Sequence, residues 1–136
     1  MRIKLAGVPI TDQDHALAFY TEKLGFVKKD DMEVAPGHRF LTVVSPEEPD
    51  GAALMLEPSG EHPATKAWKT ALYHEGIPVT AFKVDDIAAE HERLAAAGVE
   101  FKGGISDMPG ANGGTTRVAM LDDTCGNWVM IYEETG

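Results

Sequence analysis

VPITDQDHALAFYTEKLGFVKK, residues 8–29, and FKVDDIAAEHERLAAAGVEFKG, residues 82–103, are two versions of one pattern. In each, an apolar run leads to an aspartate, then to apolar residues at helical spacing, a glycine and a second apolar run. Asp12 is the expected N-cap of the first helix, and Asp85 or Asp86 that of the second. Asp86 is the one that matches Asp12 in the repeat, 74 positions on. The glycine after each helix is a common helix end. A segment that recurs with matched caps and matched helix lengths indicates an internal repeat.

The pattern around the two copies predicts an α+β fold made of two tandem βαβββ units. Helices are expected at residues 13–24, 64–73 and 87–97. Strands are expected at residues 3–10, 26–29, 39–44, 52–57, 78–84, 99–102, 115–121 and 127–133. The glycine-rich segment 103–114 is expected to be a loop that could form a flap. We predict a single domain, 1–136, with a first unit at 1–60, a connector at 61–76 and a second unit at 77–136.

Composition and charge exclude several classes of partner. The chain has 136 residues with 12 basic and 22 acidic side chains, a formal charge of −10. Such a charge repels phosphate backbones and anionic lipid surfaces, so neither nucleic acid nor membrane is an expected partner. The apolar runs are too short for a membrane helix. Cys125 is the sole cysteine, which favours a reducing compartment. We therefore predict a soluble, cytoplasmic protein. No His or Lys is near Cys125 in sequence, so a nucleophilic role is not expected.

Three segments carry a family resemblance. DQDHALAFYTEKLGF (12–26) and VDDIAAEHERLAAAGVEF (84–101) are similar to the paired helices of the glyoxalase/bleomycin-resistance/extradiol dioxygenase (vicinal oxygen chelate) superfamily. DDTCGNWVMIYE (122–133) resembles the family's Asp-Pro-Asp-Gly-Asn turn and last strand, with Thr124 and Cys125 in the place of the Pro-Asp pair. The resemblance implies a cup-shaped mixed sheet around a cavity, and a homodimer. It also implies a divalent metal that a substrate chelates.

The positions at which the family holds its metal are apolar in this chain. By the resemblance they fall at Leu5, Met55, Val79 and Met130, with Glu57 replacing Met55 if the register is shifted by two. Alkyl groups do not bind cations, and a thioether is a poor ligand for Mg, Mn, Zn or ferrous iron. We therefore predict that no metal and no other cofactor is bound. The glyoxalase I reaction and extradiol ring cleavage are both disfavoured.

Glu57 is the candidate catalytic residue. Because strand side chains alternate, Met55 and Glu57 share a face, which lines the cavity if the resemblance holds. A carboxylate there could act as a general base or bind a hydroxyl or amine of a ligand. The alternative is a strand-end glutamate that points into water.

The last strand supplies most of the candidate ligand-binding residues. Trp128, Met130 and Tyr132 alternate onto one face, which suits a flat apolar ligand. The alternative is ordinary core packing. Arg39 and Arg117 could bind an anionic group, or could be solvated edge residues. The predicted ligand-binding set is Met55, Glu57, Trp128, Met130, Tyr132 and Arg39.

Three functions fit these residues. The first, which we favour, is a glyoxalase- or bleomycin-resistance-like protein that binds or sequesters a partly apolar small molecule without a metal. The second is a lyase or isomerase of the glyoxalase-like class that uses Glu57 with an atypical metal or none. The third is an interaction module that kept the fold and has no catalytic role. The identity of the ligand does not follow from the sequence.

Overall fold

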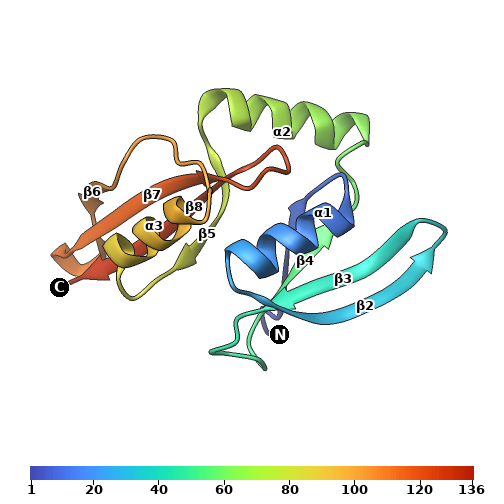
Figure 1. Ribbon diagram of the computed structural model, residues 1–136, viewed down its shortest axis with the longest axis horizontal. Coiled ribbons are helices and arrows are strands. Elements are labelled where there is room, and N and C mark those ends of the chain that lie inside the picture. The colour runs from blue at the N-terminus through green and yellow to red at the C-terminus, as the bar shows by residue number, and fades with distance from the viewer. The chain divides into compact units, whose positions relative to one another are not determined.

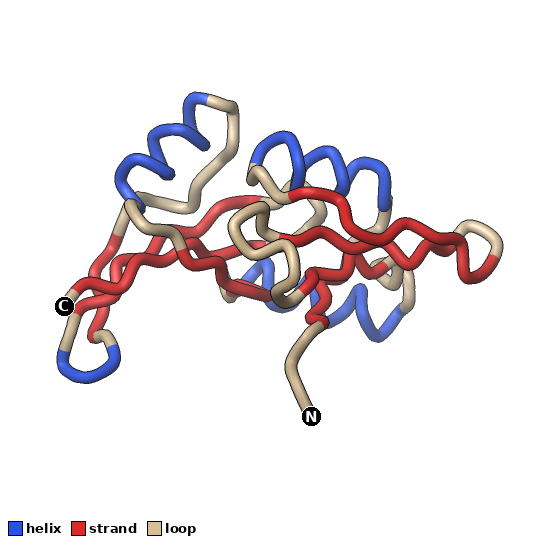
Figure 2. Tube along the Cα trace, turned by 90° about the horizontal axis from the view of Figure 1, so that it is seen from below, coloured by secondary structure: helices blue, strands red, loops and turns tan.

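The computed structural model describes residues 1–136, apart from the side chain of Asn112. The chain forms two compact units, which we describe separately. Unit 1 comprises Met1–Ala71 together with Thr124–Gly126, and unit 2 comprises Leu72–Asp123 together with Asn127–Gly136. Figure 1 labels their helices and strands, and Figure 2 shows the same trace by secondary structure.

Unit 1 contains a four-stranded sheet in the order β1-β4-β3-β2. β1 runs parallel to β4, while β3 is antiparallel to both of its neighbours. The strands are β1 (Leu5–Pro9), β2 (Val27–Ala35), β3 (His38–Val44) and β4 (Ala53–Glu57). The helices are α1 (Gln13–Ala18), its π-helical continuation η1 (Phe19–Lys23), and α2 (Pro63–Glu75), whose last residues belong to unit 2.

Unit 2 repeats this topology. Its sheet has the order β5-β8-β7-β6, and again the first two strands are parallel and the others antiparallel. The elements are β5 (Pro78–Lys83), α3 (Ile87–Ala96), β6 (Ser106–Pro109), the short 3-10 helix η2 (Ala111–Gly113), β7 (Thr115–Asp122) and β8 (Trp128–Thr135). The predicted α+β fold of two βαβββ units is confirmed.

The predicted helix caps are also confirmed. The carboxylate of Asp12 accepts a hydrogen bond from the His15 N–H at 3.0 Å, and that of Asp86 accepts one from Ala89 at 3.0 Å. Each satisfies a backbone donor that the first helical turn leaves unpaired. Gly25 has φ of 86° after η1, a conformation that side-chain-bearing residues rarely adopt.

In each unit, one face of the sheet packs under a helix. α1 lies on β3 and β4, and α3 lies on β7 and β8. Alternate strand residues fill the space between sheet and helix, and they are buried. In unit 1 these are Val8, Leu41, Val43, Leu54 and Leu56, and in unit 2 they are Ala119, Leu121, Val129 and Ile131.

Two predicted segments were wrong. The loop expected at 103–114 contains β6 and η2, and the strand expected at 99–102 forms a single bridge, between Phe101 and Leu121. SDMP has little intrinsic strand preference, so β6 exists because β7 pairs with it. β2 is longer than expected, because the charged run after Val27 lies on an edge strand, where charges are tolerated.

The added length makes the β2–β3 hairpin a ribbon. β3 pairs with β4 at Thr42 and Val43, whereas its pairing with β2 extends back to His38. Residues 31–40 are therefore a two-stranded extension beyond the sheet (Figures 1 and 2). Along the described chain, no helix is long and apolar enough to cross a membrane.

Candidate functional site

The side of each sheet that α1 or α3 leaves uncovered is termed here its helix-free face. In unit 1, Met55 lies on this face, together with its strand partners Gly7 of β1 and Thr42 of β3. Glu57, two residues along β4, points to the same side as Met55. The predicted pairing of Met55 and Glu57 on one face therefore agrees with the strand register. Other members of this face are Leu5, Met32, Phe40 and Ala53.

Gly7 lets the Glu57 side chain lie flat on the sheet. A Cβ at Gly7 would be 3.0 Å from Cγ of Glu57 and 3.8 Å from its Cδ, so the glutamate crosses the place where a side chain would stand. Glu57 is half-buried, and its carboxylate forms no hydrogen bond or ion pair with any described residue. A half-buried carboxylate without a partner on a largely apolar face is a candidate recognition group.

The helix-free face of unit 2 carries the other predicted group. Trp128, Met130 and Tyr132 project from β8 on the side opposite Val129 and Ile131, which are buried under α3. Their cross-strand partners on β7 are Asp122, Met120 and Val118 respectively. All six are half-exposed, so this face is a continuous strip of thioether, aromatic and aliphatic groups with one carboxylate.

Trp128 is held by Tyr73 of α2. The two rings stack with centroids 5.0 Å apart and planes at 8°, and the indole N–H donates to the Tyr73 carbonyl at 3.0 Å. The Tyr73 hydroxyl donates to the Asp122 carboxylate at 2.7 Å, which raises the pKa of that tyrosine. One ring face of Trp128 is thus already covered, which leaves less of the ring for a ligand than the sequence suggested.

Arg39 lies on the other side of the unit 1 sheet from Met55. Its guanidinium donates to Asp14 of α1 at 2.6 Å and to both oxygens of Asp31 at 2.9 Å. The bidentate contact with Arg39 lowers the pKa of Asp31 to about 2, and the two carboxylates raise the pKa of Arg39. Its predicted role toward a ligand stays a prediction, since these carboxylates already occupy it.

Because of the Asp31–Arg39 ion pair, the free energy of unfolding should fall at low pH. The pKa of Asp31 in the folded protein lies below its ordinary value of 3.8. The ion pair therefore stabilises the fold fully above that pH, and this stabilisation is lost as pH falls through about 2. We expect Asp31→Asn to remove this part of the acid sensitivity in urea unfolding between about pH 4 and pH 2. Asp50→Asn, at an exposed position, is the control. Equal acid sensitivity of the wild type and Asp31→Asn would contradict the pairing.

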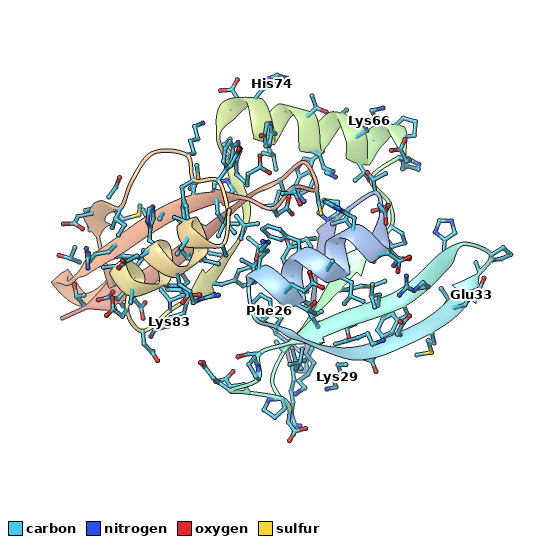
Figure 3. The ribbon with its side chains drawn as sticks, in the orientation of Figure 1. Phe26, Lys29, Glu33, Lys66, His74 and Lys83 are labelled. Atoms are coloured by element: carbon cyan, nitrogen blue, oxygen red, sulfur yellow. The ribbon has the colours of Figure 1, made fainter. Side chains whose placement is uncertain are left out.

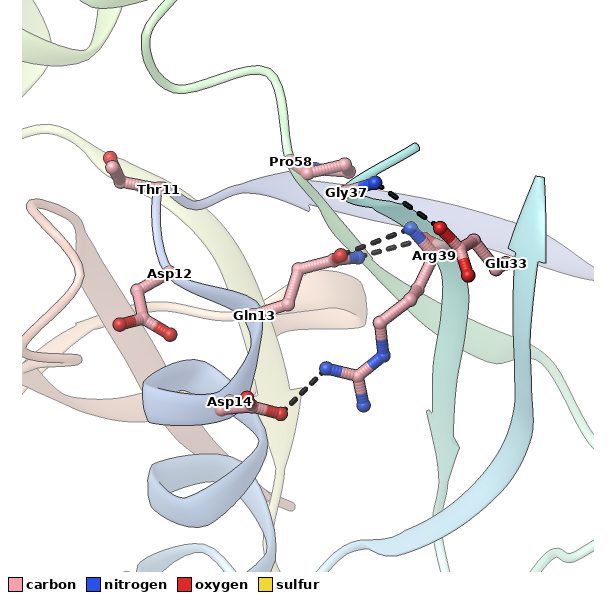
Figure 4. A pocket seen from close by; sticks show the side chains of 8 residues that line it. All are labelled: Thr11, Asp12, Gln13, Asp14, Glu33, Gly37, Arg39 and Pro58. Atoms are coloured by element: carbon pink, nitrogen blue, oxygen red, sulfur yellow. Dashed lines mark hydrogen bonds and ion pairs between the residues drawn. The ribbon is translucent and has the colours of Figure 1, made fainter. Parts of the chain in front are cut away.

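A hollow of about 410 Å³ lies beside Arg39 on the helix side of the unit 1 sheet (Figure 4). Its lining is polar, and much of it is bonded internally. The Gln13 amide binds the backbone of Arg39 and Leu56, and Glu33 accepts from the Gly37 N–H at 3.3 Å. An apolar ligand finds few partners there. The helix-free faces are therefore the better candidate site. The hollow is lined by Thr11, Asp12, Gln13, Asp14, Glu33, Gly37, Arg39 and Pro58.

The four positions that the family resemblance predicts for a metal do not suit a hard cation. Leu5 and Met55 lie on the unit 1 sheet, Met130 pairs with Ala81 and Met120, and Val79 stands at a register shift in β5. Their donors are two thioethers and no oxygen or nitrogen. Within the described residues, no group of three or more His, Cys, Asp or Glu side chains is placed to hold a metal ion. No reaction step through a metal follows from this donor set.

Several residues of these faces escaped the sequence reading. Met120, Asp122 and Tyr73 reach Trp128 and Met130 only through strand pairing and the end of α2. Alternation along β7 could have pointed to Met120 and Asp122, whereas no local signal marks Tyr73.

In unit 1, a lysine lies beside Cys125 although none is near it in sequence. Lys69 is buried and donates a hydrogen bond to the Cys125 carbonyl at 2.7 Å.

Comparison with known proteins agrees with this architecture. The profile of the Glyoxalase/Bleomycin resistance protein/Dioxygenase superfamily matches residues 2–131. The chain belongs to this superfamily. It is 43% identical over 134 residues to the uncharacterized protein YurT of Bacillus subtilis (strain 168), covering 98% of this chain and 100% of that protein.

Two solved structures show the same fold. The crystal structure of UcmS2 is 33% identical with a TM-score of 0.74, covering 97% of each chain. TnmS3, an antibiotic binding protein from Streptomyces sp. CB03234, is 24% identical with a TM-score of 0.70, covering 99% of this chain and 97% of that one. At that identity, the likeness to TnmS3 concerns the fold alone.

Proposed function

We propose that the protein binds a small, partly apolar molecule on the helix-free faces of its sheets. The observation that carries this is the placement of methionine. Every methionine after Met1 points to a helix-free face rather than to the core under α1 or α3. These residues are Met32, Met55, Met108, Met120 and Met130.

Methionine suits such a role because its side chain is flexible and polarizable and adapts to ligands of different shape. The helix-covered faces are instead built from Leu, Val and Ile, which pack in fixed rotamers. The division of residue types between the two faces supports binding on one and structural packing on the other. Ligand sites are typically apolar with a few polar groups, as the helix-free faces are.

The same fold serves an antibiotic binding protein, TnmS3. The fold can therefore hold a small molecule, and which molecule this chain binds depends on its own residues. Glu57 offers an unpaired carboxylate on the unit 1 face, so a ligand there would gain from a hydrogen-bond donor or a positive charge.

Glu57 also favours a second candidate, a lyase or isomerase of the glyoxalase-like class. An unpaired carboxylate that lies against Gly7 on an apolar face is free to take a proton from a bound substrate. We rank this below simple binding, because the four positions of the family's metal carry no suitable ligand for it.

Homodimer formation is part of the proposal. Apolar side chains on the helix-free faces are substantially exposed, with Leu5 at 49%, Met32 at 56% and Met108 at 47%. Exposed apolar surface of this kind marks sites where a ligand or a second protein binds. A second copy could cover these faces, as the family resemblance implies.

Fluorescence titration tests the binding proposal. Phenylnaphthylamine, a neutral probe that brightens in apolar sites, should bind saturably to the wild type. Met130→Gln places a polar amide at the centre of the unit 2 face and should weaken binding about fivefold or more. Ile3→Gln, at a position 88% exposed, is the control and should bind as the wild type does. Absence of saturable binding, or equal affinity in Met130→Gln, would refute the proposal for this face.

A further inference from the structure

Lys102 belongs to the helix-free face of unit 2, although it lies outside the named strands. The segment before it runs beside β7, with the Lys102 N–H donating to the Met120 carbonyl at 2.8 Å. Phe101 pairs with Leu121, and its ring stacks on His91 of α3 at 4.0 Å. Since Phe101 points toward α3, Lys102 points to the opposite side, next to Met120.

The ammonium group of Lys102 is positioned by two neighbours. It lies over the Trp128 ring, 5.5 Å from the centroid, which is within the range of a cation–π contact. It also rests against Gly76, where a Cβ would collide with it. Lys102 is exposed and forms no ion pair with the residues that the structure describes.

Two of the other charged positions on this side have partners, and a third, Glu100, alternates onto the same side as Lys102 and is exposed. Asp122 accepts the Tyr73 hydroxyl, and Lys83 pairs with Glu134 at 2.8 Å. Lys102 is thus a positioned cation that forms no ion pair with a described residue, beside the Met120–Met130 pair. A positioned cation next to apolar surface matches an amphipathic acid, whose apolar body displaces water while its anionic group meets the ammonium.

We propose that the helix-free face of unit 2 binds apolar molecules that carry an acidic group, such as an aromatic carboxylate, sulfonate or phenolate, with Lys102 as the counter-charge. This rests on the proposed function and adds the sign of the ligand's charge. The net charge of −10 repels anions from the surface in general, so a ligand of this class would depend strongly on Lys102.

Two probes with one aromatic skeleton test the assignment. Anilinonaphthalene sulfonate carries a negative charge, and phenylnaphthylamine is its neutral counterpart. Lys102→Gln should weaken the sulfonate about fivefold to tenfold and leave the neutral probe within about twofold. Lys102→Arg should restore most of the sulfonate affinity. Lys66→Gln, which removes an exposed lysine of α2 (Figure 3), is the matched control and should change neither.

The possible results distinguish a failure of the Lys102 assignment from a failure of the proposed binding function. If both probes bind the wild type and Lys102→Gln weakens neither, or weakens both equally, the charge assignment is overturned while apolar binding stands. If neither probe binds saturably, the proposed function falls and the inference falls with it. Raised salt should weaken the sulfonate more than the neutral probe, and equal salt sensitivity would count against the ion pair.

Discussion

Replacing Gln13 by alanine should lower the free energy of unfolding by about 3 kcal/mol. The Gln13 side chain is 7% exposed and joins the start of α1 to two strands. Its amide N–H₂ donates to the carbonyls of Arg39 at 2.8 Å and Leu56 at 3.1 Å, and its oxygen accepts from the Arg39 N–H at 3.1 Å. Alanine would leave three backbone groups without partners in a largely buried position, which costs more than the bonds themselves contribute.

Urea denaturation at neutral pH measures this effect. Gln13→Glu refines the test, because a carboxylate can accept from Arg39 but cannot donate to the two carbonyls. It should therefore destabilise the protein at least as much as alanine. Glu22→Ala, in the same helical segment but exposed, is the control and should stay within about 0.5 kcal/mol of the wild type. A loss below about 1 kcal/mol for Gln13→Ala would show that water replaces the amide.

The repeat could be predicted because helix caps and helix ends depend on interactions between residues that are close in sequence. Asp12 and Asp86 cap helices through a donor three residues away, so their spacing alone reveals them. Gln13 gave no such signal. Its three partners lie 26 and 43 positions along the chain, and a glutamine at the start of an amphipathic helix usually faces water.

The same distinction applies to the candidate site. Alternation along β4 and β8 was enough to place Met55 beside Glu57 and Trp128 beside Met130, since a strand fixes the face of every second residue. The stacking of Tyr73 and the position of Lys102 depend on where the ends of α2 and of the segment before β6 come to lie. No periodicity encodes such contacts, because they are set by the tertiary structure.

The surroundings of Arg39 could not be predicted from the sequence. Its strand position made it a candidate ligand-binding residue, a role that stays a prediction, but did not show which side chains would bind its guanidinium. In the structure, pairing of Thr42 with Met55 sends Arg39 toward α1, where Asp14 and Asp31 bind it. Its partners come from a helix and from the β2 ribbon, whose length was not predicted.

Trp128 gives the second large expected effect. Trp128→Ala should lower the free energy of unfolding by about 3 kcal/mol, because it removes the stack on Tyr73 and the indole hydrogen bond to its carbonyl. Trp128→Phe keeps an aromatic ring under Tyr73 and deletes only the N–H, so it should cost about 1 kcal/mol. Urea unfolding of both variants, followed by circular dichroism, measures the difference.

Phenylnaphthylamine binding distinguishes a structural tryptophan from one that a ligand contacts. Because Tyr73 covers one face of the ring, Trp128→Phe should bind the probe within about twofold of the wild type, while Met130→Gln binds it much more weakly. The Trp68→Phe background leaves Trp128 as the only tryptophan and reports its surroundings directly. If Trp128→Ala is as stable as the wild type but no longer binds the probe, then the stack of Tyr73 on Trp128 does not stabilise the fold and the ligand contacts the Trp128 ring directly. Tyr73 would then cover the ring face to which the ligand binds.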